Sequence, residues 1–509
     1  MLYHNKILEP LVDLSKNDPS FVVFSTGKSS ISAKALLTKS NILATALLKN
    51  SFKEGDVALL VIKPGIDFLV VFYSLMMLRA KIAIIDPEMG RDNYYAKMRQ
   101  LSPKWLFADS RLLLISYNTV LRNLINIFYK KIPRLYFVDG MNVVSTGKKF
   151  IGTNQRSLAS LTANTELRPL LKNNENYECL IVYTSGTLGL PKGVVHSIYS
   201  LTESLSKLSD LLKVKEGNIL GSHLPHFILL GIASGYTVES VNPQRSAEKR
   251  LQELAQKKIN AYFGTPAEIQ ELVLHCEKHS KFFPKTLRQL FLGSAPVYQS
   301  FLARLLSLLD TNTEVICFYG MTEHLITATI TGREKVKYSG EGDIVGKITD
   351  GVSISIADDN EIMVSSTQLF SRYFHEAQGN VQHESGDQGC INDSGELILL
   401  GRKKDMIIRR DFNIYPSLYE DTIRSIPGVS EAVLCGVYDE SLQDEKVFLL
   451  WEGDNITNNQ IKNKLLSGIY SIDKNALPDV ILMMTLPRTG RHQKIDKKLL
   501  REQLKYKNL

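Results

Sequence analysis

The feature that most constrains the fold is an alternation of buried strands and helices in the first part of the chain. The apolar run 56–62 (DVALLVI) is followed by a turn, an 11-residue apolar stretch from Phe68 to Leu78, and a second apolar run that ends at Asp86. Continuous apolar strands joined by a crossover helix are typical of a parallel sheet covered on both faces. The strand 176–183, a loop of small residues and a helix from about Ser197 continue the pattern. The sequence therefore predicts an α/β fold with parallel sheets wrapped by helices.

The pattern changes after about residue 340. Short segments rich in Ile, Val, Asp and Gly follow one another there, which indicates antiparallel strands with turns. The last hundred residues mix strands with helices and end in a basic helix. Because Gly401-Arg402 follows a complete strand, we place a boundary there. Residues 1–401 would form a large domain with a β subdomain, and 402–509 a small α+β domain.

Composition excludes several classes of protein. The 509 residues are 44% apolar and 22% charged, close to an average globular enzyme, and the net charge of +8 is too mild to argue for nucleic acid. The five cysteines are scattered without ligand spacing, which argues against disulfides and zinc. No basic-then-apolar signal opens the chain, and its longest apolar stretch falls short of the roughly 18–20 residues that span a bilayer. We expect a cytoplasmic protein with at most peripheral membrane contact.

The strongest functional signal is the loop from Thr184 to Gly193 (TSGTLGLPKG), directly after the strand 176–183. Small residues leave backbone N–H groups free to face an anion, and glycines let the backbone approach phosphate oxygens. Lys192 adds a cation suited to a polyphosphate. Composition alone would also fit a flexible Ser/Gly connection, and the spacing of a Walker loop is missing.

The string itself resembles the phosphate loop of the adenylate-forming superfamily, which includes acyl-CoA synthetases, luciferases and peptide-synthetase adenylation domains. Further segments resemble that family's motifs in the family's order, over roughly residues 56 to 500. Alone, each segment would also fit a structural role. The segments that resemble the family's motifs are Gly293–Pro296 (GSAP), Tyr319–Glu323 (YGMTE), Gly386-Asp387, Gly401–Asp405 (GRKKD), Asn413–Pro416 and 487–496.

The resemblance implies a role for each matching residue. Tyr319 would lie along the adenine, Thr322 would reach the α-phosphate, and Glu323 with Thr187 would hold Mg²⁺. Lys404 would be the hinge of a mobile C-terminal domain. The implied catalytic residues are Lys192, Thr322, Glu323 and Lys494. The implied ATP-binding residues are Thr184, Ser185, Gly186, Thr187, Gly189, Lys192, Gly293, Ser294, Ala295, Tyr319, Gly320, Thr322, Asp387, Arg402 and Lys494.

The family's reaction has two steps. A carboxylate attacks the α-phosphate of MgATP to give an acyl-adenylate and pyrophosphate, and a nucleophile such as the coenzyme A thiol then displaces AMP. The first step brings two anions together, so it needs cations more than acid–base groups. The resemblance thus implies an acid–thiol ligase that uses ATP, Mg²⁺ and, as acceptor, coenzyme A.

The acyl pocket would be lined by residues 224–238, again by resemblance. This segment has no charged residue, which disfavours amino acids and dicarboxylates as substrates. Apolar burial contributes about 0.8 kcal/mol per CH₂, so a medium- or long-chain fatty acid is favoured. The implied pocket residues are His226, Phe227, Ile228 and Gly231, with Ile228 at the gating position; His226 would be either a polar contact or a structural group.

Alternatives remain open. Ile85 to Asn93 (IDPEMGRDN) resembles a segment of the ATP-dependent β-lactone synthetases of olefin pathways. Those enzymes adenylate a β-hydroxy fatty acid, whose own hydroxyl then expels AMP. The adenylate could instead load an acyl carrier protein. Finally, departures from the family's motifs at Leu188, Ile228, Asp411 and Gln493 would also fit a non-catalytic nucleotide or acyl binder.

Overall fold

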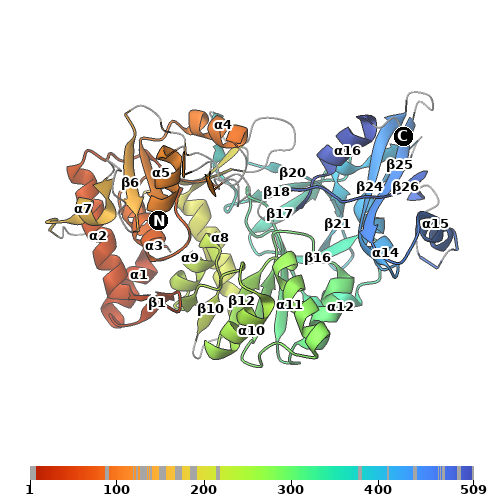
Figure 1. Ribbon diagram of the computed structural model, residues 1–509, viewed down its shortest axis with the longest axis horizontal. Coiled ribbons are helices and arrows are strands. Elements are labelled where there is room, and N and C mark those ends of the chain that lie inside the picture. The colour runs from red at the N-terminus through yellow and green to blue at the C-terminus, as the bar shows by residue number, and fades with distance from the viewer. Residues whose placement is uncertain are drawn as a thin grey trace.

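The computed structural model of the chain describes most of its residues. Within them, two large sheets form the framework, one of 13 strands and one of 8 strands. Figure 1 shows these sheets with the C-terminal elements, in blue, lying together at one end. The described residues are 7–85, 91–118, 120–121, 124–125, 135, 137, 140–147, 156–166, 175–183, 192–213, 218–376, 381–409, 412–439, 444–467, 469–470, 472, 476–489 and 494–506.

The 8-stranded sheet contains the strands predicted near the N-terminus. Its strands pair in parallel, except that β9 is antiparallel to β8 and β19 is antiparallel to β9. Helix α3 (Ile66–Met77) connects β3 to β4 and is buried from Phe68 to Met77, so the apolar stretch is a core helix, as predicted. In spatial order the strands are β19 (Arg372–Tyr373), β9 (Gly193–Ser197), β8 (Glu178–Tyr183), β4 (Lys81–Ile84), β3 (Val57–Val61), β5 (Trp105–Asp109), β6 (Asn142–Thr146) and β7 (Arg156–Ser157).

The 13-stranded sheet changes from parallel to antiparallel pairing along its width. The pairs from β1 through β11, β10, β12 and β13 to β14 are parallel, and pairing is antiparallel from β15 onward. The antiparallel region expected after residue 340 therefore begins slightly earlier. The strands are β17 (Val352–Ile356), β18 (Glu361–Ser366), β20 (His383–Ile391), β21 (Glu396–Arg402), β16 (Asp343–Ile348), β15 (Ala328–Thr331), β14 (Glu314–Tyr319), β13 (Gln289–Leu292), β12 (Ala261–Gly264), β10 (Ile219–Gly221), β11 (Thr237–Glu239), β1 (Val22–Ser25) and β2 (Ser30–Ser32).

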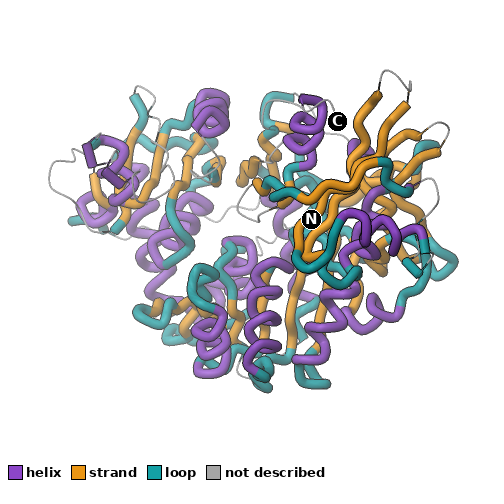
Figure 2. Tube along the Cα trace, turned by 45° about the vertical axis from the view of Figure 1, so that its right-hand side comes forward, coloured by secondary structure: helices purple, strands orange, loops and turns teal. Residues whose placement is uncertain are grey.

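Helices flank the strands, as Figure 2 shows. The helix expected from about Ser197 begins at Ile198, because the Ser197 side chain accepts a hydrogen bond from the Ser200 N–H and caps the helix. No helix in the described part of the chain is long and apolar enough to cross a membrane. The helices of this region are α1 (Glu9–Asn17), α2 (Ala33–Lys49), α4 (Arg91–Leu101), α5 (Ser110–Tyr117), α7 (Leu158–Thr162), α8 (Ile198–Asp210), α9 (Pro225–Ala233), α10 (Ala247–Gln256), α11 (Pro266–His279), α12 (Gln299–Leu308) and α13 (Gly332–Lys337).

The C-terminal elements have hydrophobic cores of their own. Two buried clusters consist entirely of residues from Ile407 onward, while β21 ends at Arg402. These clusters support the boundary at 401/402, which we retain as a proposal. The elements are the 3₁₀ turn Lys403–Asp405, β22 (Ile407–Arg409), β23 (Phe412–Ile414), α14 (Pro416–Arg424), β24 (Val429–Asp439), β25 (Asp444–Gly453), α15 (Asn458–Leu466), β26 (Val480–Met483), β27 (Arg488–Thr489), β28 (Lys494–Ile495) and α16 (Lys497–Tyr506).

Candidate active site

Three of the predicted nucleotide-binding side chains meet where β14, β20 and β21 lie near one another. Tyr319 ends β14, and its hydroxyl donates a hydrogen bond to Oδ2 of Asp387 at 2.8 Å. Arg402, at the end of β21, places Nε 2.7 Å from Oδ1 of the same carboxylate. Asp387 and Arg402 are paired residues on neighbouring strands. The sheet therefore brings together groups that lie far apart in the sequence.

Burial determines the charge states in this cluster. The Asp387 residue is 5% exposed, and burial raises the pKa of its carboxyl, although Arg402 and the Tyr319 hydroxyl oppose the shift. The pKa of Tyr319 is raised well above its usual value by burial and by the adjacent Asp387 carboxylate. Tyr319 is thus a neutral hydrogen-bond donor at physiological pH.

Lys494 reaches this cluster from the far end of the chain. It begins β28, where it pairs with Thr489 of β27. Burial lowers the pKa of Lys494, and so do the charges of Arg402 and Lys404, while the Asp387 carboxylate opposes them. The Lys494 residue is exposed, and the charges of Asp387 and Arg402 act on its ammonium. The competing Lys497 instead places Nζ 2.8 Å from Oε1 of Glu420, inside the C-terminal elements.

The loop after β14 carries Thr322 and Glu323 and is held from two sides. A side chain at Gly320 would overlap the Leu325 carbonyl oxygen, so this turn requires glycine. Nε2 of His196, in β9, donates to the Thr322 carbonyl at 2.8 Å. The Phe370 N–H donates to the Glu323 carbonyl at 2.9 Å.

Tyr373 connects the Glu323 carboxylate with Lys192. The Tyr373 hydroxyl donates to Oε1 of Glu323 at 3.0 Å, and Nζ of Lys192 lies 4.5 Å from the centre of the Tyr373 ring. Sequence reasoning missed Tyr373 and His196. Neither lies in a recognisable motif. Each contacts the Glu323 loop because the pairing of its strand brings it there.

The rest of the predicted phosphate loop lies outside the described residues. This applies to Thr184, Ser185, Gly186, Thr187 and Gly189, whose implied roles stay predictions. Departures at Leu188, Asp411 and Gln493, and the positions 86–90 of the β-lactone-synthetase-like segment, also lie outside the described residues.

The turn Gly293–Ala295 directly follows β13. A Cβ on Gly293 would lie 2.6 Å from Cδ2 of Phe318, so only glycine fits against this ring. Ser294 has a φ of 67°, in the left-handed region. The turn lies beside β14, which is paired with β13 and ends at Tyr319. It therefore follows the strand next to the one that ends at Tyr319, and its role at the nucleotide stays a prediction.

The four predicted acyl-pocket residues on α9 fall into two pairs. Phe227 stacks on Phe263 with ring centres 3.8 Å apart, and the half-buried His226 lies 5.0 Å from Phe227. Phe318 extends this aromatic group, 5.9 Å from Phe263. The other pair, Ile228 and Gly231, lies in tight core packing. Ile228 is 0% exposed, and a Cβ on Gly231 would lie 2.9 Å from Cδ2 of Leu220 in β10. Pocket roles for all four stay predictions.

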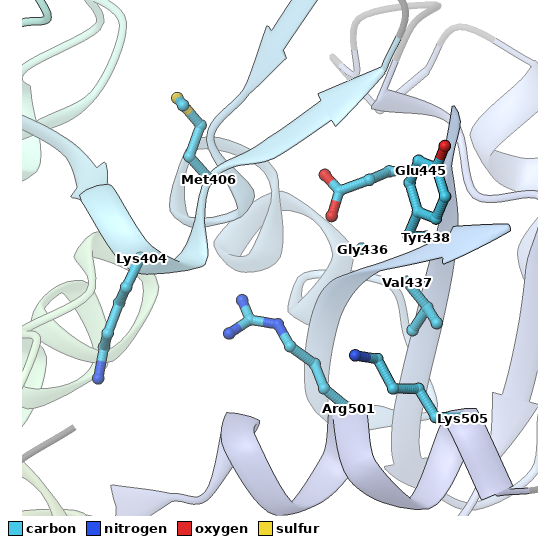
Figure 3. A pocket seen from close by; sticks show the side chains of 8 residues that line it. All are labelled: Lys404, Met406, Gly436, Val437, Tyr438, Glu445, Arg501 and Lys505. Carbon is cyan, nitrogen blue, oxygen red and sulfur yellow. The ribbon is translucent and has the colours of Figure 1, made fainter. Parts of the chain in front are cut away.

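Lys404, the predicted hinge, lines a cavity of about 220 Å³ in the C-terminal elements. Figure 3 shows Arg501 and Lys505 extending into it from α16, with Tyr438 and Glu445 on the strands across from them. Nη2 of Arg501 lies 3.1 Å from Oδ1 of Asp405, the residue that follows Lys404. Burial lowers the pKa of Lys404.

Glu323 is suited to hold a metal ion whose other ligands are supplied by a bound nucleotide. Among the described residues, no group of three or more His, Cys, Asp or Glu side chains is placed to hold a metal ion. Mg²⁺ is typically held by one or two carboxylates together with substrate phosphates and waters. A single oriented carboxylate near the predicted phosphate lysine therefore fits Mg²⁺ that arrives with ATP.

Comparison with known proteins identifies the family of the chain. The family described as "AMP-binding enzyme" matches residues 13–374. The chain belongs to the AMP-binding enzyme family. A long-chain-fatty-acid–CoA ligase, FadD13 of Mycobacterium tuberculosis, is 24% identical over 493 residues, 91% of each chain. An olefin beta-lactone synthetase of Stenotrophomonas maltophilia is 24% identical over 451 residues, 79% of this AMP-binding enzyme and 78% of the relative.

Solved structures share the fold of this AMP-binding enzyme. The o-succinylbenzoate CoA synthetase of Bacillus subtilis, in complex with its acyl-adenylate intermediate, superposes with a TM-score of 0.78 at 18% identity, covering 97% of each chain. The α/β fold with a small C-terminal part is confirmed. The membership in the adenylate-forming superfamily is confirmed as well.

Proposed function

We propose that this AMP-binding enzyme activates a medium- or long-chain fatty acid with ATP and then transfers the acyl group to a thiol such as coenzyme A. The observation that carries the proposal is the cluster of Tyr319, Asp387 and Arg402, together with the effect of the Asp387 and Arg402 charges on Lys494. A lysine from the last part of the chain lies near the groups assigned to the nucleotide. That is the arrangement that adenylate formation requires.

The charges of the site suit the first half-reaction. A carboxylate and a triphosphate repel each other, so fixed cations that face the developing charge lower the barrier. Lys192, Arg402 and Lys494 would supply such cations on this chain. Glu323 would hold Mg²⁺, which when bound offsets further phosphate charge. The buried carboxylate of Asp387, oriented by two hydrogen-bonding partners, would accept hydrogen bonds from the ribose hydroxyls.

The acyl side supports an apolar substrate. Phe227, Phe263 and Phe318 form a stacked aromatic group beside the turn at Gly293. No charged residue lies in the segment 224–238. A relative that is named as a long-chain-fatty-acid–CoA ligase supports the same substrate class. An aliphatic chain gains about 0.8 kcal/mol for each CH₂ that it buries in an apolar pocket.

Pyrophosphate exchange across a panel of acids tests the proposal. The protein is incubated with ATP, Mg²⁺, labelled pyrophosphate and saturated acids from about C6 to about C18, a range chosen to span about 8 kcal/mol or more of methylene burial. We expect exchange with fatty acids and little with amino acids or dicarboxylates of matched length. Absence of exchange with every acid would contradict the proposal and favour a non-catalytic nucleotide or acyl binder.

A β-lactone synthetase is the second candidate function, because an olefin beta-lactone synthetase is among the relatives. The two candidates differ in the acceptor. After exchange is established, β-hydroxy and unsubstituted acids are compared with and without coenzyme A. Acyl-CoA from both acids supports the ligase. AMP release from the β-hydroxy acid alone, without coenzyme A and with a β-lactone product, supports the second candidate.

A further inference from the structure

We propose that Tyr373 is a positioning residue that couples Lys192 to Glu323 and thereby sets the affinity of the site for the magnesium–nucleotide complex. The inference rests on the proposed function, in which Lys192 meets the phosphates and Glu323 the metal. Tyr373 itself contacts neither ATP nor the substrate in this account. It acts through the two side chains that it holds.

Tyr373 contacts the two charged side chains with different parts of its ring. Its hydroxyl donates a hydrogen bond to Oε1 of Glu323 at 3.0 Å. The face of the ring lies under the Lys192 ammonium, 4.5 Å from Nζ to the ring centre. Tyr373 therefore contacts both charged side chains, one through its hydroxyl and the other through its ring face.

The backbone around Tyr373 is fixed on both sides. The Ser371 N–H donates to the Val195 carbonyl at 2.7 Å, and the Phe374 N–H donates to the Gly193 carbonyl at 2.8 Å. The Phe370 N–H donates to the Glu323 carbonyl. The short strand β19 therefore links the strand that begins directly after Lys192 to the loop that carries Glu323.

The rings next to Tyr373 limit its rotation. The Phe370 ring lies 4.8 Å from the Tyr373 ring, and the His383 ring lies 5.1 Å from Phe370. A tyrosine held by packing and by backbone pairing is preorganised, so little conformational entropy is lost when a ligand binds to the groups it orients.

A neutral tyrosine suits this position. Burial raises the pKa of Tyr373 well above its usual value, and the Glu323 carboxylate raises it further. The hydroxyl therefore keeps its proton and donates a hydrogen bond to Glu323, and the charged carboxylate stays available to a cation. Lys192 on the ring face gives up only a cation–π contact when it turns to a phosphate, and not a full ion pair.

Two substitutions separate the two contacts. Tyr373→Phe keeps the ring under Lys192 and removes the hydroxyl, whereas Tyr373→Leu removes both. Binding of the non-hydrolysable analogue α,β-methylene ATP is measured by calorimetry over a series of Mg²⁺ concentrations and without Mg²⁺. Pyrophosphate exchange is measured over the same series.

For Tyr373→Phe we expect the Mg²⁺ concentration at half-maximal binding and exchange to rise roughly 10-fold or more, the effect of losing one hydrogen bond to a charged group. Binding without Mg²⁺ should be unchanged, because Lys192 keeps its contact. Tyr373→Leu should show the same Mg²⁺ shift and also weaker binding without Mg²⁺. Tyr117→Phe, which removes a hydroxyl from a half-exposed tyrosine on α5, is the matched control and should behave as wild type.

The outcomes distinguish this inference from the proposed function. Wild-type Mg²⁺ dependence in a folded Tyr373→Phe variant overturns the inference. A lower melting temperature with reduced exchange but no Mg²⁺ shift also overturns it, because that result means a structural role only. If the wild type binds the nucleotide analogue but gives no exchange with any acid, the proposed function fails while the calorimetric comparison still decides the role of Tyr373. A wild type that binds no nucleotide overturns both.

Discussion

Lys494 shows how one side chain depends on the placement of a whole segment. It lies in a two-residue strand that pairs with Thr489, and the charges of Arg402, Lys404 and Asp387 all act on its pKa. Burial and two neighbouring cations lower that pKa, so the ammonium has few favourable partners beside Asp387. An anion placed there by a nucleotide would relieve this repulsion.

Lys494→Ala should therefore cripple adenylate formation and leave release from a preformed acyl-adenylate largely intact. The lysine would offset charge at the α-phosphate only in the first half-reaction. Losing one such contact costs about 10²–10³ in rate. The half-reactions are measured separately, by pyrophosphate exchange and by consumption of a supplied acyl-adenylate. Lys498→Ala, at an exposed position on α16, is the control and should leave both rates unchanged. Equal losses in both half-reactions would identify Lys494 as structural.

At the scale of residues, the sequence predicted the side chains that belong to motifs and missed those that hold them. Tyr319, Asp387 and Arg402 were found because their motifs are contiguous, and the structure brings them together. His196 and Tyr373 contact the Glu323 loop from 126 and 50 residues away. Such contacts depend on which strands pair, and no local pattern of apolar and polar residues encodes that choice.

Helix α14 contacts residues of the large N-terminal part of the chain. Cζ of Arg424 lies 4.1 Å from the centre of the Tyr298 ring, and Nη2 of Arg424 donates a hydrogen bond to the Tyr298 hydroxyl at 3.1 Å. The Ser300 hydroxyl donates to Oδ1 of Asp421 at 2.9 Å. These contacts are present in the same arrangement of the C-terminal part in which the Asp387 charge acts on Lys494. The family resemblance implies that the C-terminal part turns between the half-reactions, and that turn would break them.

Tyr298→Leu should therefore slow adenylate formation more than the second half-reaction. A cation–π contact contributes about 0.5–2 kcal/mol, so the arrangement with Lys494 in place should lose roughly 2- to 30-fold in population. Tyr298→Phe keeps the ring and should have a smaller effect, and Ser300→Ala, which loses one exposed hydrogen bond, should have almost none. Separate assays of the two half-reactions provide the measurement. Identical rates for Tyr298→Leu and wild type would show that this contact does not hold the arrangement.

At the scale of elements, apolar runs predicted the fold well, whereas short polar strands were not predicted. The run around 56–62 and the helix after it were recognisable because buried parallel strands are continuously apolar. The strand β9 (GVVHS) was not predicted, since a glycine and two polar residues in five positions resemble a loop. It is nevertheless buried throughout, because pairing with β8 and β19 places it inside the sheet.

For the whole molecule, two buried histidines link stability to pH. Burial lowers the pKa of His196 to about 4, against the opposing effect of its hydrogen bond to Thr322. Burial also lowers the pKa of His324 to about 4, and the charges of His196 and His383 add to that shift. Both histidines are therefore neutral in the folded protein, whereas in the unfolded chain they take up protons near pH 6.5.

The free energy of unfolding should thus fall as the pH drops from about 6.5 toward 4. Above pH 6.5 neither state binds the protons, so the contribution is constant. Below it only the unfolded state does, and each histidine removes up to about 1.4 kcal/mol per pH unit. Urea unfolding between about pH 7 and pH 5 measures the slope. His196→Gln keeps an N–H donor for the Thr322 carbonyl. It should remove the contribution of one histidine from the slope of the free energy of unfolding against pH. An unchanged slope in the variant would show that His196 does not titrate as described.

The strand β19 also has a consequence for the order in which the molecule is completed during synthesis. The chain leaves the 13-stranded sheet after β18, crosses to the 8-stranded sheet for β19, and returns for β20. Arg372 of β19 bonds Glu178 across 194 residues of sequence. On the ribosome, β9 therefore forms an uncovered edge for most of the time that the middle of the chain is being made. Unpaired edges invite pairing with other chains, and large proteins expose them while they fold. Once residues 372–373 emerge, they can pair with Val194 and Val195 and cover that edge.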